Sequence, residues 1–255
     1  MGRGRFVWFD LMSTDVEASK RFYASLFGWE IKGVDMGEFT YNMVEAGGAG
    51  LGGIMPLDAA HGMPSHWMGY LECGDVDETS RRVEALGGKV CTPAMDIPNV
   101  GRFSIVSDPQ GAFFSPFASK TPEQYDAAPE PGLGHVGWSE LMTSDDEGAK
   151  AFYGELLGWS AEGMDIGDMG VYHLVSQGGS AQFAGIMKTP AGANMPTAWL
   201  YYINVVDADA TAARVADLGG ALIVEPMTIP GGGRIAVFTD STGAAMGVLS
   251  PPVQI

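Results

Sequence analysis

The stretch Trp8-Phe-Asp-Leu-Met-Ser-Thr-Asp15 decides the fold, because the chain contains it twice. It recurs 130 residues later as Trp138-Ser-Glu-Leu-Met-Thr-Ser-Asp145. Repeats of this kind indicate that a structural unit has been duplicated. The residues that follow also match: Lys20, Phe22, Tyr23, Leu26, Gly28 and Trp29 return as Lys150, Phe152, Tyr153, Leu156, Gly158 and Trp159.

The duplication continues to the end of the chain. Leu86-Gly-Gly88 matches Leu218-Gly-Gly220, now 132 residues apart, so the second copy carries a two-residue insertion in a loop. Residues 119–134 are rich in proline and small residues and lack apolar periodicity, which is typical of a linker. We therefore expect one domain at residues 1–118, a linker at 119–134 and a second domain at 135–255.

The residue pattern of each copy predicts two modules, and each module consists of a strand, a helix and three further strands. Thr14-Asp-Val-Glu17 has the T-x-x-E form of a helix start, and Ser144-Asp-Asp-Glu147 repeats it. A helix from there to Gly28 presents apolar residues at three- and four-residue spacings. Four βαβββ modules predict an α+β fold, with helices on one face of curved mixed sheets and a cleft on the other. In the first copy, strands are expected near residues 5–12, 29–31, 41–44, 50–55, 67–72, 89–95, 102–106 and 112–117, with a second helix at 75–86 and a turn at Asp108-Pro-Gln-Gly111.

Charge and composition limit the kinds of partner that we expect this protein to bind. The formal net charge of -17 repels phosphate backbones and anionic lipids, so we expect neither nucleic acid nor membrane as a partner. No apolar run is long enough to span a bilayer and no signal peptide is recognised, which predicts a cytoplasmic location. We expect a monomer or a homodimer. Cys73 and Cys91 lack metal-site or redox spacing and are assigned no role. The sequence shows no nucleotide-binding glycine loop, hydrolase elbow or Cys–His nucleophile pair.

The order and spacing of these motifs resemble the vicinal-oxygen-chelate superfamily, the glyoxalase/bleomycin-resistance/dioxygenase proteins. The stretches that carry the resemblance are Pro64-Ser-His-Trp67, Asp75-Val-Asp77, Leu86-Gly-Gly88, Asp96-Ile-Pro98, Gly101-Arg102 and Asp108-Pro-Gln-Gly111. The resemblance covers nearly the whole chain and implies two tandem glyoxalase-like domains. It also implies a small organic ligand or substrate.

Metal-using members of that superfamily place histidine, glutamate or glutamine on the first and last strands of the modules. Register counting puts those positions at residues that offer no imidazole or carboxylate, so we predict neither a metal site nor another cofactor. No cluster of histidine ligands is expected either: His61, His66, His135 and His173 are interpreted as separate, ordinary residues. The six strand positions are Trp8, Trp138, Met68, Leu200, Ser115 and Gly247.

Two carboxylates are candidates for catalysis. Asp10 and Glu140 follow the repeated tryptophans by two residues and therefore share their strand face. A carboxylate in an apolar cleft has a raised pKa, which suits proton transfer beside a substrate carbonyl. The competing interpretation is that each carboxylate accepts hydrogen bonds from neighbouring backbone or from an arginine. Both interpretations stay open.

Repeated aromatic residues and arginines are candidates for ligand binding. Rings on the strands that open the modules would stack on a flat ligand, although core residues would give the same pattern. Arg102 and Arg234 would hold an anionic group or form a salt bridge between modules. The aromatic set is Trp8, Trp138, Trp67, Tyr70, Trp199 and Tyr202.

These features favour a small-molecule-binding protein with apolar aromatic clefts, acting in sequestration, sensing or resistance. The alternative is an enzyme, a lyase or isomerase that acts on a ketoaldehyde adduct or related carbonyl compound with Asp10 or Glu140 as general base. A dioxygenase or hydroxylase has less support, because no cofactor motif accompanies it.

Overall fold

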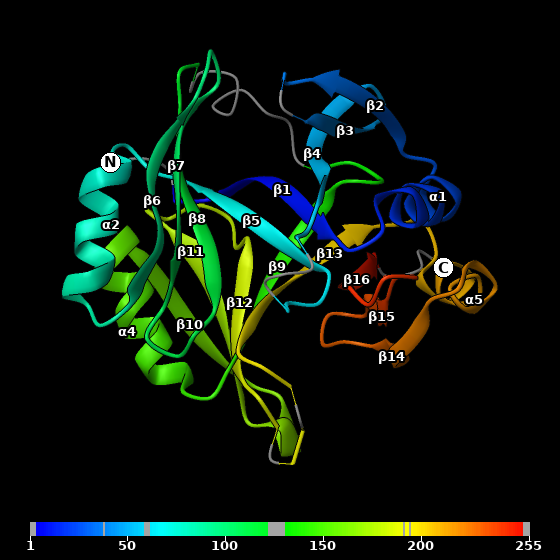
Figure 1. The fold of residues 1–255 in the computed structure, drawn as a ribbon. Helices are drawn as coiled ribbons and strands as arrows, with labels where there is room; N and C mark the ends of the chain where they lie inside the picture. The colour runs from blue at the N-terminus through cyan, green and yellow to red at the C-terminus, as the bar shows by residue number, and fades with distance from the viewer. Residues whose placement is uncertain are drawn as a thin grey trace. The chain divides into compact units, whose positions relative to one another are not determined.

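The protein is described by a computed structural model that covers residues 4–37, 39–58, 62–121, 131–190, 192–193 and 195–251. Sixteen strands form two eight-stranded sheets, one from each sequence copy, and Figure 1 shows the elements in order. The order of the first sheet is β2-β3-β4-β1-β5-β8-β7-β6, and the second repeats it as β10-β11-β12-β9-β13-β16-β15-β14. The predicted α+β fold of four βαβββ modules is confirmed.

The element bounds agree with the expected ranges to within a few residues. The first copy contains β1 (Phe6–Ser13), α1 (Val16–Phe27), β2 (Glu30–Asp35), β3 (Thr40–Ala46), β4 (Ala49–Pro56), β5 (His66–Glu72), α2 (Val76–Ala85), β6 (Lys89–Ile97), β7 (Gly101–Ser107) and β8 (Phe113–Ser119). The second contains β9 (Val136–Thr143), α4 (Asp146–Leu157), β10 (Trp159–Asp165), β11 (Val171–Gln177), β12 (Ala184–Lys188), β13 (Ala198–Asn204), α5 (Ala208–Ala213), β14 (Ala221–Thr228), β15 (Arg234–Thr239) and β16 (Ala245–Ser250). Short 3-10 helices lie at Gly167–Met169 and Ala216–Leu218.

The helix starts differ from the expected T-x-x-E pattern by one residue. Asp15, not Thr14, caps α1: its side chain accepts a hydrogen bond from the Ala18 amide at 2.9 Å. Asp145 caps α4 in the same way, so the expectation of Ser144 is also wrong. Each aspartate has extended backbone, and its carboxylate reaches the free amide three residues further on. The predicted end of α1 is confirmed, since Gly28 has a left-handed φ of 71°.

Close strand packing explains Gly52 in the leading module of the first copy. β1 and β4 pair in parallel, with Phe9 opposite Gly52. A Cβ atom on Gly52 would lie 1.7 Å from the Phe9 carbonyl oxygen, so only glycine fits there. The turn at residues 108–111 is also confirmed: the Gly111 amide donates to the Asp108 carbonyl at 3.1 Å.

The compact units of the chain do not follow the two sequence copies. One unit combines Met1–Val7, Gly69–Ala128 and Ser139–Trp199, and the other combines Trp8–Met68, Pro129–Trp138 and Leu200–Ile255. Each unit therefore joins one module of the first copy to one module of the second. The two sheets follow the sequence copies, and the expected domain limits at residues 118 and 135 stay a prediction. Most of the expected linker, residues 122–130, lies outside the described residues.

An equivalent polar link lies in the core of each unit. In the first unit, the Tyr153 hydroxyl accepts a hydrogen bond from Trp199 Nε1 at 3.0 Å and donates one to Asp108 Oδ2 at 3.2 Å. In the second, Trp67 Nε1 donates to the Tyr23 hydroxyl at 2.9 Å. Burial and the Asp240 carboxylate raise the pKa of Tyr23. Each tyrosine thus satisfies buried polar groups that belong to other elements.

Candidate functional site

Asp10 lies in a hydrogen-bonded group on β1 and β3. The Tyr41 hydroxyl donates a 2.7 Å hydrogen bond to Asp10 Oδ1, and Trp8 Nε1 donates a 2.7 Å bond to the same hydroxyl. Alternation along β1 places Trp8 and Asp10 on one face, as predicted. The Asp10 side chain is buried, and a substrate must reach it through the neighbouring side chains.

The second copy repeats the carboxylate–tyrosine pair. The Tyr172 hydroxyl on β11 donates a 2.9 Å hydrogen bond to Glu140 Oε2 on β9. Glu140 is only half-buried, so this carboxylate is easier to reach than Asp10. The two tyrosines were not among the predicted site residues. Their signal is the repeat itself, since Tyr41-Asn-Met-Val44 returns as Tyr172-His-Leu-Val175.

A glycine beneath each tyrosine makes room for its ring. A Cβ atom on Gly53 would lie 2.2 Å from Cζ of Tyr41, and one on Gly185 would lie 1.9 Å from the Tyr172 hydroxyl oxygen. Gly53 pairs with Asp10 across β1 and β4, as Gly185 pairs with Glu140 across β9 and β12. The repeated Gly-Ile-Met segment therefore orients each tyrosine toward its carboxylate.

Trp67 and Trp199 lie in the cores of their units. Trp67 packs against Tyr23 and Trp29, with ring centroids 5.3 and 6.0 Å apart. Trp199 makes equivalent contacts with Tyr153 and Trp159 at 5.5 and 5.9 Å. Both indoles are buried and hydrogen-bonded to these tyrosines. Their positions match the core interpretation of the aromatic pattern.

The other predicted aromatic residues divide between the two units. Tyr202 is buried against Leu200 and Val237, and Trp138 packs on this cluster while partly exposed. The Tyr202 ring covers Gly247, where a Cβ atom would lie 2.3 Å from Cδ1 of the tyrosine. Tyr70 contacts Phe103 and Phe117, with ring centroids 5.9 and 6.0 Å apart.

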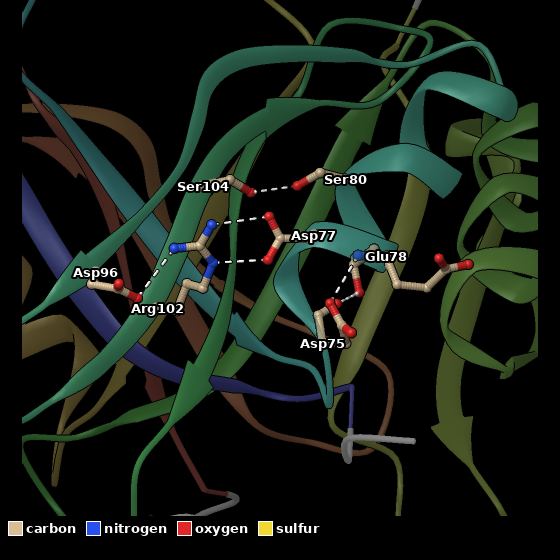
Figure 2. Close-up of polar contacts among 8 residues, drawn as sticks. Asp75, Asp77, Glu78, Ser80, Asp96, Arg102 and Ser104 are labelled. Carbon is tan, nitrogen blue, oxygen red and sulfur yellow. Dashed lines mark hydrogen bonds and ion pairs between the residues drawn. The ribbon is translucent and has the colours of Figure 1, made fainter.

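Both predicted arginines form salt bridges within their own modules. Arg102 on β7 donates to both oxygens of Asp77 on α2, at 2.8 and 3.0 Å, and to Asp96 on β6 at 3.1 Å (Figure 2). The hydrogen bonds that Arg102 donates lower the pKa of Asp77, and the carboxylates of Asp77 and Asp96 that accept them raise the pKa of Arg102. Arg234 forms the equivalent pair with Asp209. The expectation of a bridge between modules is wrong, because the partners lie on the adjacent helix and strand.

The six strand positions that register counting assigns to metal ligands offer no donor set. Ser115 is fully buried and donates its hydroxyl hydrogen to the Ser104 carbonyl at 2.7 Å. The remaining five positions hold tryptophan, methionine, leucine and glycine, which do not fit a divalent ion.

Elsewhere, the expectation that no histidine joins a potential ligand cluster is wrong. Among the described residues, Asp146, Glu147 and His173 have potential ligand atoms within 4.8 Å of one another. Sequence reasoning missed this group because β11 and the start of α4 are distant in the sequence. His66 and His135 hydrogen-bond to the Pro64 and Leu133 carbonyls beside them. His61 lies outside the described residues.

Two cavities lie away from the carboxylate–tyrosine pairs. One, of about 330 Å³, is lined by residues of α4 and β10–β12, including Glu147, Lys150 and Val175. The other, of about 320 Å³, lies beside Phe27, Leu133 and Arg214.

No helix in the described part of the chain is long and apolar enough to cross a membrane.

Comparison with known proteins gives the family. The pattern of the Glyoxalase/Bleomycin resistance protein/Dioxygenase superfamily matches residues 5–115 and 132–247. A Mycobacterium tuberculosis protein named "Putative glyoxylase CFP32" is 38% identical over 97% of this chain and 95% of its own length. "Anthracycline biosynthesis protein DauV" of Streptomyces sp. (strain C5) is 34% identical over 96% of this chain and 93% of its own.

Solved structures share the fold at low sequence identity. The Mn(II)-bound glyoxalase from Novosphingobium aromaticivorans has a TM-score of 0.67 at 19% identity, covering 98% of this chain and 83% of that one. The 2,3-dioxygenase LapB from Pseudomonas sp. KL28 has a TM-score of 0.65 at 13% identity, covering 99% and 93%. With the family pattern matched twice and relatives aligned along almost their whole length, the chain belongs to the glyoxalase/bleomycin resistance protein/dioxygenase superfamily.

Proposed function

We propose that the protein is a glyoxalase-like small-molecule-binding protein that recognises its ligand at the two carboxylate–tyrosine pairs, without the superfamily's metal site. The observation that carries the proposal is the duplicated hydrogen bond, Tyr41 to Asp10 and Tyr172 to Glu140, each with a glycine beneath the tyrosine ring. A role in sequestration, sensing or resistance needs recognition alone.

The chemistry of the pairs favours a ligand with both apolar and polar groups. Tyrosine rings and the neighbouring indole of Trp8 offer flat apolar surfaces, while the hydroxyl and carboxylate oxygens orient polar substituents. Glu140 is the better candidate for direct contact because it is more accessible than Asp10. An aromatic or carbonyl-containing molecule fits this combination.

The missing donor set supports a metal-independent role. The positions expected for ligands hold side chains that cannot coordinate a hard or borderline cation. The names of the relatives point to two ligand classes to test, glyoxalase substrates and anthracyclines.

Tryptophan fluorescence tests the proposal directly. The protein is titrated with a panel of anthracyclines, other aromatic metabolites and ketoaldehyde–thiol adducts, with thermal shift as a second readout. We expect saturable binding that Tyr172→Phe and Glu140→Gln weaken. Glu162→Gln, an exposed carboxylate on β10, removes the same charge as a control and should leave binding unchanged. No saturable signal across the panel, or equal binding by all variants, would overturn the proposal.

The alternative function is a lyase or isomerase that acts on a ketoaldehyde adduct or related carbonyl compound. The partly exposed Glu140 supports it, since a general base must reach the proton that it removes. The test is turnover of methylglyoxal with thiols before and after chelation of metals. Activity that survives chelation and is lost in Asp10→Asn and Glu140→Gln would favour the enzyme over the binding protein.

A further inference from the structure

Three potential metal ligands meet where α4 begins beside β11, in the part of the chain that Figure 1 labels α4 and β10–β12. Nε2 of His173 lies 3.1 Å from Asp146 Oδ2 and 3.5 Å from Glu147 Oε1. His173 is 3% exposed, Asp146 is 17% exposed and Glu147 is 71% exposed at the side chain. The group therefore runs from the core to solvent, which gives a cation a path of entry.

The separations suit a tetrahedral ion. Bonds of 2.0–2.1 Å to nitrogen and oxygen, as zinc makes, place neighbouring ligand atoms roughly 3.3 Å apart in a tetrahedron. The two separations from His173 Nε2, 3.1 and 3.5 Å, lie on either side of this value. Two carboxylates and one imidazole would leave the fourth position to water.

The charge of the group favours a cation. Partial burial opposes ionisation of Asp146, but its hydrogen bond with His173 and those with nearby backbone amides lower its pKa overall. Lys150 is the nearby positive group, and its ammonium lies 2.9 Å from Glu147 Oε2. The same ammonium lies 3.0 Å from Glu147 Oε1, the oxygen that faces His173, so a metal ion bound there would displace Lys150 from this oxygen. Two carboxylates beside one ammonium leave a net negative charge.

The histidine ring faces this group through Nε2. Its Nδ1 is buried and has no hydrogen-bond partner among the described residues, so the polar contacts of the ring are those at Nε2. A metal bond at Nε2 would replace the hydrogen bond between His173 and Asp146, and the ring proton would then lie on Nδ1.

The first copy lacks the group. Its equivalent of His173 is Asn42, which donates to the Ile54 carbonyl at 3.0 Å, and its equivalent of Asp146 is Val16. Glu17 and Lys20 pair there at 2.8 Å, just as Glu147 and Lys150 do. The imidazole and the second carboxylate thus occur together in one copy and are both absent from the other.

We propose that Asp146, Glu147 and His173 form a binding site for a zinc-like divalent transition metal on the helix side of the second copy. The site is separate from the carboxylate–tyrosine pairs and does not depend on the function proposed for them. The metal would fasten the start of α4 to β11.

Calorimetric titration of the chelator-treated full chain with Zn²⁺ tests this site, and Co²⁺ absorption reports its geometry. We expect one equivalent bound per chain, with a tetrahedral Co²⁺ spectrum. Glu147→Gln should weaken binding by roughly tenfold or more, since even outer-sphere partners contribute that much. His173→Asn, which installs the residue of the first copy, should abolish the Co²⁺ spectrum.

Glu17→Gln is the matched control, because it removes the equivalent lysine-paired carboxylate in the copy without a histidine. It should bind Zn²⁺ like the unmodified protein. If His173→Asn fails to fold, Glu147→Gln decides, because this exposed side chain can change without disturbing the core. Less than one equivalent bound by the unmodified protein, or equal affinity of Glu147→Gln and Glu17→Gln, would overturn the proposal.

Discussion

The Tyr41 hydroxyl donates a 2.7 Å hydrogen bond to the carboxylate of Asp10, across 31 residues of sequence. The tyrosine ring lies over Gly53, and the second copy repeats the arrangement with Tyr172 over Gly185. The glycines therefore offer a way to move each tyrosine without removing its hydroxyl.

Gly185→Ala is expected to displace the Tyr172 ring and weaken ligand binding at Glu140. The new methyl group would meet the free end of the tyrosine side chain, which can swing away, so the fold should survive. Fluorescence titration with a ligand from the panel measures the loss, and circular dichroism checks the fold. Gly185→Ala binding as tightly as the unmodified protein would show that the tyrosine position is not needed.

Gly52→Ala should behave differently from its neighbour Gly53→Ala. At Gly52 the methyl group would meet the Phe9 carbonyl at 1.7 Å, and this backbone atom cannot move without breaking the pairing of β1 and β4. We expect a lower free energy of unfolding for Gly52→Ala and a change mainly in binding for Gly53→Ala. Urea unfolding curves of the two variants make the comparison, and equal stability losses would contradict it.

Tyr153→Phe should lower the free energy of unfolding by roughly 2–4 kcal/mol, because it leaves Trp199 Nε1 and Asp108 Oδ2 without their buried partner. Burial raises the pKa of Asp108, while the hydrogen bond from Tyr153 opposes that rise. A raised carboxylate pKa destabilises the folded state as pH rises through it, so the loss should be greatest at neutral pH and smaller in acid. Urea unfolding at several pH values measures this, and a loss that is independent of pH would contradict the role of Asp108.

The sequence predicted the modules because each is a local pattern. Periodicity, the Leu-Gly-Gly ends and the Asp-Pro-Gln-Gly turn depend on neighbouring residues, and the helix start erred only in choosing Thr14 over Asp15. The repeat also predicted that Asp10 shares a face with Trp8, since strand alternation needs only a two-residue spacing.

The side-chain partners could not be predicted in this way. Trp67 meets Tyr23 through packing between elements, and the pattern of aromatic residues gave no reason to prefer this core contact over a cleft. The His173 group is missed for the same reason, because its carboxylates lie 26 and 27 residues earlier in the chain. The salt bridges of Arg102 could not be predicted either, because they depend on which helix and strand lie beside β7.

Asp77→Asn should make thermal stability less dependent on pH in acid. Hydrogen bonds from Arg102 lower the folded pKa of Asp77 below its ordinary value of 3.8. A lowered carboxylate pKa stabilises the fold above the unfolded pKa, and this contribution is lost as pH falls through the folded pKa. We would measure the melting temperatures of Asp77→Asn and of the unmodified protein between about pH 2.5 and 6. The two melting temperatures should converge at the acid end of this range. Since the pair is exposed, added salt should narrow the difference at pH 6, and parallel curves would contradict the prediction.

The two cysteines should react with a thiol reagent at very different rates. Cys91 is exposed, whereas Cys73 is buried and burial raises its pKa to about 11. Since the thiolate is the reactive form, Cys73 has both a low thiolate fraction and poor access. Iodoacetamide at pH 8 should therefore modify Cys91 alone in the folded protein and both residues in urea, with mass spectrometry of peptides identifying the sites. Cys91→Ser provides the control: the folded variant should remain unmodified, and rapid labelling of Cys73 would show that β5 and the start of α2 open readily.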